Sequence, residues 1–362
     1  MKKETISGQK MCAMLVVFMI GNSIVSGGST NLKQDAWISI IIGLLIAIPI
    51  LLIYIRIINL YPSKNIYEVL IELFGNIIGK IIMIFFIWYC FHLGAIVLRN
   101  FSEFIQIVSK PETPQIVIAL AIIFTSIYLV KSGIMVIGRW SVVIFIIILF
   151  FVLGTFSLGL ANIKFEYLLP FCNHSFREIM KDSFIYYSFP YAETVVFLSF
   201  FDSLRPNEKV SKVFLYGFLI SVCMQLLIIF RNITLLGPEM FHISLFPSYV
   251  ALRIIGIGRF LTRFEGFALI NFLLLGISKI SLSLFAAIKG VTCLFEFKNY
   301  KRLVIPIGLL MVSLSAIIYN NTLEMFSFVN FYPYYAFPFQ VIIPVIIWIF
   351  AERKVGKLKP KS

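Results

Sequence analysis

The residues Phe189-Pro190-Tyr191-Ala192-Glu193 lie in the middle of an apolar segment that runs from Ser183 to Phe201. Proline removes a backbone donor and its ring clashes with the preceding turn, so Pro190 is expected to interrupt a helix here. Backbone groups freed within a membrane must be buried in protein or face a cavity, because lipid cannot satisfy their hydrogen bonds. The stretch therefore predicts a broken membrane helix beside a cavity that binds something.

A second interrupted segment, Met11–Ser29, lies at the corresponding place in the first half of the chain. Its apolar run contains Gly21-Asn22-Ser23-Ile24 and then Gly27-Gly28. Paired interruptions in two halves are typical of transporters whose binding site lies at the membrane midplane between inverted repeats. Small residues let a ligand approach the backbone, and exposed N–H groups at such a break suit a carboxylate.

Composition excludes most other classes of protein. The chain has 362 residues, of which 60% are hydrophobic and 13% are charged, and its mean hydropathy is +0.97. Soluble domains carry about 25% charged residues, so the sequence predicts a polytopic membrane protein. The net charge of +14 is explained by Lys and Arg in cytoplasmic loops, so no nucleic-acid partner is expected.

The apolar runs predict ten membrane-spanning helices, each near the roughly 20 residues that cross a bilayer. The expected spans are Met11–Ser29, Ala36–Ile58, Ile77–Leu98, Gln115–Val130, Trp140–Leu160, Ser183–Phe201, Val213–Leu236, Phe264–Ile288, Leu303–Ile318 and Phe337–Phe350. They divide into five plus five, with one repeat over 11–160 and the other over 183–350. A basic tail, 351–362, completes the single transporter-like domain. The prediction is an all-α fold with broken helices 1 and 6.

The distribution of basic residues predicts the orientation. With the N-terminus inside, cytoplasmic pieces hold 20 of the 31 Lys and Arg residues and the opposite side holds 10. Both termini are therefore expected in the cytoplasm. On the outer side, the loop Gly237–Arg263 contains an apolar stretch, Ser248–Ile257, that is expected to form a short interfacial helix over the pocket.

Two charged residues stand out within the expected spans, Glu193 and Lys279. Glu193 is the one acidic residue in the middle of a span, and a charge at that depth indicates a functional site. It is expected either to contact a ligand or to hydrogen-bond across to the first broken helix. Lys279 has three open alternatives: pairing with Glu193, binding carbonyls of the first span, or extending to the cytoplasmic surface.

The predicted pocket also has an aromatic wall, and the sequence shows no sign of catalysis. Tyr187, Phe189 and Tyr191 surround Pro190 and line the expected cavity. The three histidines and five cysteines are scattered without metal-ligand spacing, so no metal and no cofactor is expected. No phosphate-binding loop or nucleophile–base arrangement occurs, and an enzyme is not predicted.

Several short motifs, in order, resemble the spore germination permeases. The motifs are Ile6-Ser7-Gly8-Gln9, the Gly21 break, Asp35-Ala36-Trp37-Ile38-Ser39, Tyr61-Pro62-Ser63-Lys64 with Gly75 to Lys80, Thr113-Pro114, Leu169-Pro170, Phe189-Pro190-Tyr191-Ala192-Glu193 and Arg263-Phe264-Glu265. These permeases are the membrane B subunits of GerA-type germinant receptors, within the amino acid–polyamine–organocation superfamily. The resemblance covers nearly the whole chain.

The resemblance implies a multi-pass subunit of the spore inner membrane that works with an A-type membrane subunit and a C-type lipoprotein. Its pocket would lie on Gly21, Asn22, Ser23 and Ile24 of span 1 and on Phe189, Pro190, Tyr191 and Glu193 of span 6. Ala192 stands where the family usually has Gly, which would narrow the pocket. Many superfamily transporters hold sodium between spans 1 and 8, and Lys279 on span 8 would replace that cation.

The combined interpretation is a receptor on a transporter scaffold. A small germinant, expected to be an amino acid, would bind between helices 1 and 6 and signal through partner subunits. The alternative is a proton-coupled amino acid permease that uses Glu193 or Lys279 as the proton carrier. Both need the same pocket, so the sequence leaves them open.

Overall fold

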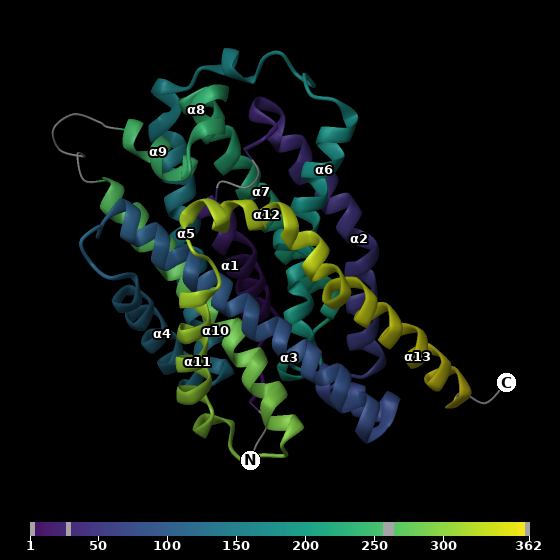
Figure 1. The fold of residues 1–362 in the computed structure, drawn as a ribbon. Helices are drawn as coiled ribbons and strands as arrows, with labels where there is room; N and C mark the ends of the chain where they lie inside the picture. The colour runs from purple at the N-terminus through teal and green to yellow at the C-terminus, as the bar shows by residue number, and fades with distance from the viewer. Residues whose placement is uncertain (1–3, 27–29, 256–263, 359–362) are drawn as a thin grey trace.

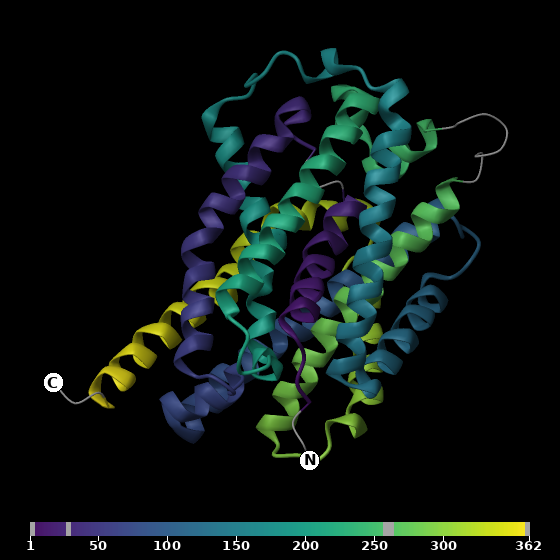
Figure 2. The same cartoon turned by 180° about the vertical axis from the view of Figure 1, so that it is seen from behind.

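Helices make up the fold throughout the described residues, which are 4–26, 30–255 and 264–358 of the computed structural model, with side chains outside the description at 22–26, 264–265 and 356–358 (Figures 1 and 2). No strand occurs in these ranges. An isolated bridge joins Ile6 to Leu204, where Ile6 N donates to Ser203 O at 2.8 Å. This bridge connects the segment before the first helix to the end of the broken one.

The first half of the chain forms five helices. They are α1 Gly8–Ser26, α2 Ala36–Leu60, α3 Ile66–Val108, α4 Gln115–Ser132 and α5 Ile134–Gly159. The long α3 is two helices joined at Gly75, whose φ of +73° is a left-handed value that favours glycine. Asn65 begins α3 by accepting from the backbone of Tyr67 and Glu68, so the short helix before Gly75 has a firm start.

The second half begins with the broken helix that the sequence predicts. Ser175 caps the start of α6, Phe176–Tyr186. This helix is followed by a π-helical turn, Tyr187–Tyr191, and by a 3-10 segment, η5, Ala192–Ser199. Within the π-helical turn Phe189 has a non-helical φ of −137° and ψ of 102°. The break therefore lies at Phe189-Pro190, and this prediction is confirmed.

The remaining elements complete the bundle. They are α7 Val210–Leu236, α8 Pro238–Ile243, α9 Pro247–Ile254, α10 Phe264–Leu294, α11 Val304–Ile317, α12 Thr322–Phe337, a π-helical turn Pro338–Ile342 and α13 Ile343–Leu358. The short helix expected within Ser248–Ile257 is present as α9. Figure 1 shows α12 crossing in front of α1 and continuing into α13 toward the lower right.

The interruption expected at Gly21-Asn22-Ser23 is wrong, because α1 is helical without a break from Gly8 to Ser26. Gly21 instead allows close packing between helices: a β-carbon there would lie 3.5 Å from Leu275 O and 3.5 Å from Cβ of Lys279, both on α10. The second expected interruption, Gly27-Gly28, lies outside the described residues. Figure 2 shows α1 in the middle of the bundle, where it packs against α5, α7 and α10.

Length and hydropathy support a multi-pass membrane protein. In the described part of the chain, seven helical stretches are long and apolar enough to cross a membrane, and Gly8–Gly21 and Val304–Ile317 are shorter apolar helices. The seven are Lys33–Leu60, Ile66–Val108, Gln115–Ser132, Ile134–Asn162, Val210–Leu236, Gly266–Leu294 and Thr322–Val355. Each of the ten expected spans has a helical counterpart once the broken segment is included, while the number that cross the membrane stays a prediction.

Candidate functional site

An ion pair lies directly beside the break in the sixth span. Nζ of Lys279, on α10, is 2.5 Å from Oε2 of Glu193, on η5. Both side chains are 0% exposed. Two charges removed from water are costly unless they are paired and hydrogen-bonded, so each of these residues stabilises the other's charge.

Hydrogen bonds continue from this pair into α12 and α3. Tyr332, on α12, donates to Oε1 of Glu193 at 2.7 Å, and its hydroxyl lies 3.2 Å from that of Tyr89 on α3. Gln340 Nε2 donates to the Tyr89 hydroxyl at 3.0 Å and to Ser188 O, within the break, at 2.9 Å. These hydrogen bonds link Glu193 through Tyr332, Tyr89 and Gln340 to the break itself. The amide of Gln340 satisfies the backbone carbonyl of Ser188, which lies within the break.

Aromatic rings cover the ammonium group of Lys279. Its Nζ lies 4.6 Å from the ring centroid of Phe18 on α1 and 5.0 Å from that of Phe189 in the break. A cation over an aromatic face is stabilised electrostatically, most strongly where water is excluded. Phe18 is fully buried, whereas Phe189 is only half-buried. Phe189 is therefore the more exposed of the two rings that cover the ion pair.

The structure distinguishes between the alternatives for the two charged residues. Lys279 pairs with Glu193 and is fully buried, so it does not extend to the cytoplasmic surface. Among the described residues, Glu193 accepts hydrogen bonds from Lys279 on α10 and Tyr332 on α12, and no such bond joins it to the described side chains of the first span. The stem of Lys279 does lie against α1 at Gly21, at the contact between spans 1 and 8.

Some predicted pocket residues face other helices. The Tyr191 hydroxyl donates to Ile40 O on α2 at 3.3 Å, and its ring packs on Phe218 of α7. Tyr187 packs beside Gly43 of α2, where a β-carbon would lie 3.1 Å from Tyr187 N.

The structure thus brings together Phe189, Pro190, Glu193, Lys279 and Gly21. The side chains of Asn22, Ser23 and Ile24 lie outside the described residues.

Sequence reasoning missed Phe18, Tyr89, Tyr332 and Gln340. Each lies in or beside an apolar run, where single aromatic or amide residues are common packing residues. A usable signal in the sequence was Gln340, an amide side chain between Pro338 and Pro344 in the expected tenth span. The structure buries this side chain. Its partners come from α3 and the break, so only the packing of distant segments identifies them.

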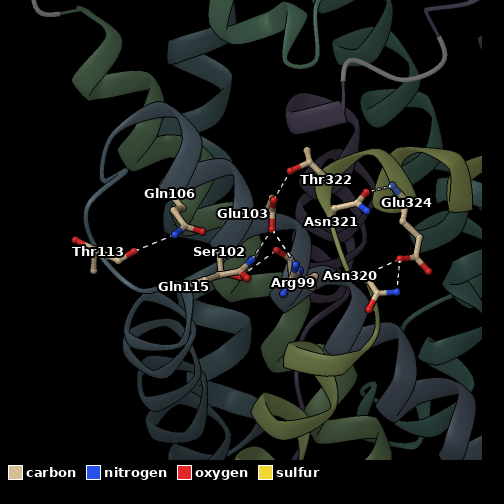
Figure 3. A network of polar contacts seen from close by, with 10 residues as sticks. All are labelled: Arg99, Ser102, Glu103, Gln106, Thr113, Gln115, Asn320, Asn321, Thr322 and Glu324. Carbon is tan, nitrogen blue, oxygen red and sulfur yellow. Dashed lines mark hydrogen bonds and ion pairs between the residues drawn. The ribbon is translucent and has the colours of Figure 1, made fainter.

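A polar network at the far end of α3 holds the start of α12, the helix that carries Tyr332. Glu103 accepts a hydrogen bond from Thr322 Oγ1, the first residue of α12, and one of 2.8 Å from Gln115 Nε2. Arg99 Nη2 lies 3.2 Å from Oε2 of the same carboxylate. Figure 3 shows these side chains converging on Glu103 from α3, α4 and the start of α12. This network therefore fixes the N-terminal end of α12 and helps to position Tyr332 on the same helix.

The chemistry available at the site is charge pairing, hydrogen bonding and cation–π contact. Among the residues that the structure describes, no group of three or more His, Cys, Asp or Glu side chains is placed to hold a metal ion. The carboxylate of Glu193 can accept hydrogen bonds from an ammonium group, and the ammonium of Lys279 can donate to a carboxylate. The two groups carry charges opposite to the two charges of a small zwitterion.

A protein-family profile described as "Spore germination protein" matches residues 5–325. The chain is 28% identical to "Spore germination protein KB" of Bacillus subtilis (strain 168), with 100% of this chain and 98% of that protein covered. It is 27% identical to "Putative spore germination protein YfkT" of the same organism, over 89% and 88% of the two chains. "Spore germination protein GerQB" of Bacillus cereus is 23% identical over the same shares.

Solved transporters share the fold. MHP1, a nucleobase-cation-symport-1 family transporter in a closed conformation with bromovinylhydantoin bound, has a TM-score of 0.65 at 14% identity and covers 94% of this chain and 78% of its own. MhsT in complex with L-phenylalanine has a TM-score of 0.67 at 11% identity, covering 98% and 90%. Both are built from inverted repeats, which confirms the predicted fold class at the level of architecture.

Proposed function

Because this chain belongs to the spore germination protein family, we propose that it is the membrane subunit of a germinant receptor. A small germinant binds between α1 and the broken segment α6–η5, beside the pair of Glu193 and Lys279. The germinant is an amino acid. The subunit lies in the spore inner membrane with both termini in the cytoplasm, as the excess of Lys and Arg on that side favours.

The buried ion pair at a helix break is the observation that supports this proposal. A charge pair without exposure to water gives little net stability, and hydrophobic residues of similar volume often serve as well. A free amino acid carries one ammonium and one carboxylate. It can replace the internal pair group by group, with its ammonium on Glu193 and its carboxylate on Lys279. One relative of this fold, MhsT, was solved with an amino acid bound, which is compatible with such a ligand.

The covered pair also suggests how binding becomes a signal. In the structure Glu193 is held from α10 and α12, and rings of Phe18 and Phe189 cover Lys279. A ligand that binds only after these contacts are released shifts the equilibrium from the covered state toward one in which Glu193 and Lys279 are accessible. An A-type membrane subunit and a C-type lipoprotein subunit then respond to the position of the moved helices.

Equilibrium binding to the purified full chain tests the proposal. We expect thermal stabilisation by one or a few amino acids from a panel of the twenty and common nucleosides, confirmed by equilibrium dialysis. Glu193→Gln and Lys279→Met should each weaken that binding, while Glu112→Gln, at an exposed position between α3 and α4, should leave it unchanged. Unaltered binding in both site variants would refute the proposed location.

The transporter fold specifically favours one alternative, a proton-coupled amino acid permease with Glu193 or Lys279 as the proton carrier. Uptake of the bound amino acid into vesicles that contain the purified chain, driven by a pH gradient, distinguishes the two functions. Adjacent genes for a multi-span protein and a lipoprotein would favour the receptor. Uptake that is abolished by Glu193→Gln would favour the permease.

A further inference from the structure

A pocket of about 560 Å³ lies between the N-terminal halves of α1, α5 and α7, away from the ion pair. The three helices all begin at this end of the bundle, as the lower half of Figure 2 shows. Deeper in the pocket the lining is apolar, with Val142, Phe145 and Ile146 from α5 and Ile220 from α7. Ile146 is 46% exposed, so the pocket is a groove open on the side of the bundle rather than a closed cavity.

The mouth of this groove is basic. Lys10, Lys209 and Lys212 line it together with a single carboxylate, Glu208. The stem of Lys10 packs on α5, where a β-carbon at Gly138 would lie 3.3 Å from its Cβ. In the described part of the chain none of the three ammonium groups forms an ion pair or a hydrogen bond. Three unpaired cations therefore surround the polar end of an apolar groove.

We propose that this groove binds an anionic phospholipid. The phosphate lies among Lys10, Lys209 and Lys212, and one acyl chain occupies the apolar wall formed by α5 and α7. Basic pockets between membrane helices on the cytoplasmic side bind anionic lipid headgroups, and the positive-inside count assigns this end to that side. The polarity of the groove, charged at the helix starts and apolar toward the bilayer centre, matches an amphiphile better than a soluble anion.

The lipid contacts α1, the helix that carries Phe18 and Gly21, at its first turns. A bound chain fills the space between α1 and its neighbours α5 and α7, so it favours the arrangement seen here over one in which α1 tilts away. This inference does not rest on the germinant site, because no residue of the ion pair lines the groove.

Native mass spectrometry of the purified full chain tests the proposal, with phosphatidylglycerol and phosphatidylcholine of matched chains as probes. We expect selective retention of phosphatidylglycerol by the wild type. Changing all three groove lysines to Gln should lower its affinity at least about tenfold, because each lysine near a lipid surface contributes roughly fivefold. Val142→Phe, which fills the apolar end without changing charge, should lower retention of the same lipid.

A matched control changes three basic residues at the same end of the bundle but outside the groove: Lys298→Gln, Lys301→Gln and Arg302→Gln. All three are exposed, and the change in net charge is the same. Melting temperature and size-exclusion profiles establish that every variant folds. Equal retention of the two lipids, equal loss in the control, or displacement by soluble glycerol phosphate would each overturn the proposal.

Discussion

Tyr332 donates a hydrogen bond of 2.7 Å to Oε1 of Glu193, while Lys279 pairs with the other oxygen at 2.5 Å. The carboxylate of the broken helix is thus held by two helices that both lie far from it in the sequence. Because α12 supplies the tyrosine and α10 the lysine, both contacts must be released before both carboxylate oxygens are free for another partner.

Tyr332→Phe removes one hydrogen bond to the carboxylate and keeps the ring. A hydrogen bond to a charged group contributes about 1.5–3 kcal/mol. This one stabilises the covered state, in which Lys279 and Tyr332 hold Glu193 and the rings of Phe18 and Phe189 cover Lys279. We expect spores with this variant to germinate at roughly tenfold lower germinant concentration, because the covered state is weakened. A dose–response curve shifted to higher concentration would instead place the hydroxyl on the ligand.

Glu193→Gln leaves the ammonium of Lys279 buried without a counter-charge, which costs about 3–5 kcal/mol. We expect low accumulation in the membrane and a response shifted to at least about tenfold higher ligand. Adding Lys279→Met removes the unpaired charge, so the double variant should recover normal accumulation but not the response. Immunoblots of spore membranes and germination curves measure the two effects separately. Recovery of the response in the double variant would show that the pair has only a structural role.

Two substitutions at Gly21 test the contact between α1 and α10. A β-carbon there would make ordinary van der Waals contacts of 3.5 Å, so Gly21→Ala should be tolerated. Gly21→Leu forces the two helices apart beside Lys279, and we expect loss of the response while the protein still reaches the membrane. The pair of variants is compared by germination rate at equal protein level. An unchanged rate in Gly21→Leu would exclude this contact from the mechanism.

Replacing sodium by potassium tests the role of Lys279 as an internal cation. Its ammonium already pairs with Glu193, and its stem lies at the contact between spans 1 and 8, so we expect no need for a sodium ion there. The wild-type response should therefore be the same in both salts. Lys279→Arg should recover only part of the activity lost in Lys279→Met, because guanidinium is planar and larger. A response that needs sodium would contradict the idea.

Local features of the sequence were enough to predict the helical membrane fold and the break in the sixth span. Apolar runs near 20 residues depend only on composition, and Pro190 acts on its own turn. Glu193 and Lys279 could be singled out from the sequence by the cost of a charge at membrane depth, which holds whatever the partner.

Packing between distant segments decided the rest. A glycine in a membrane helix can either interrupt the helix or allow a neighbouring helix to pack closely. Only the proximity of α10 shows that Gly21 allows close packing. Glu193 and Lys279 are 86 residues apart, and Tyr332 is 139 from Glu193. Such pairs are set by how helices α10 and α12 pack against the break, because apolar helix surfaces allow many arrangements until buried polar groups find partners.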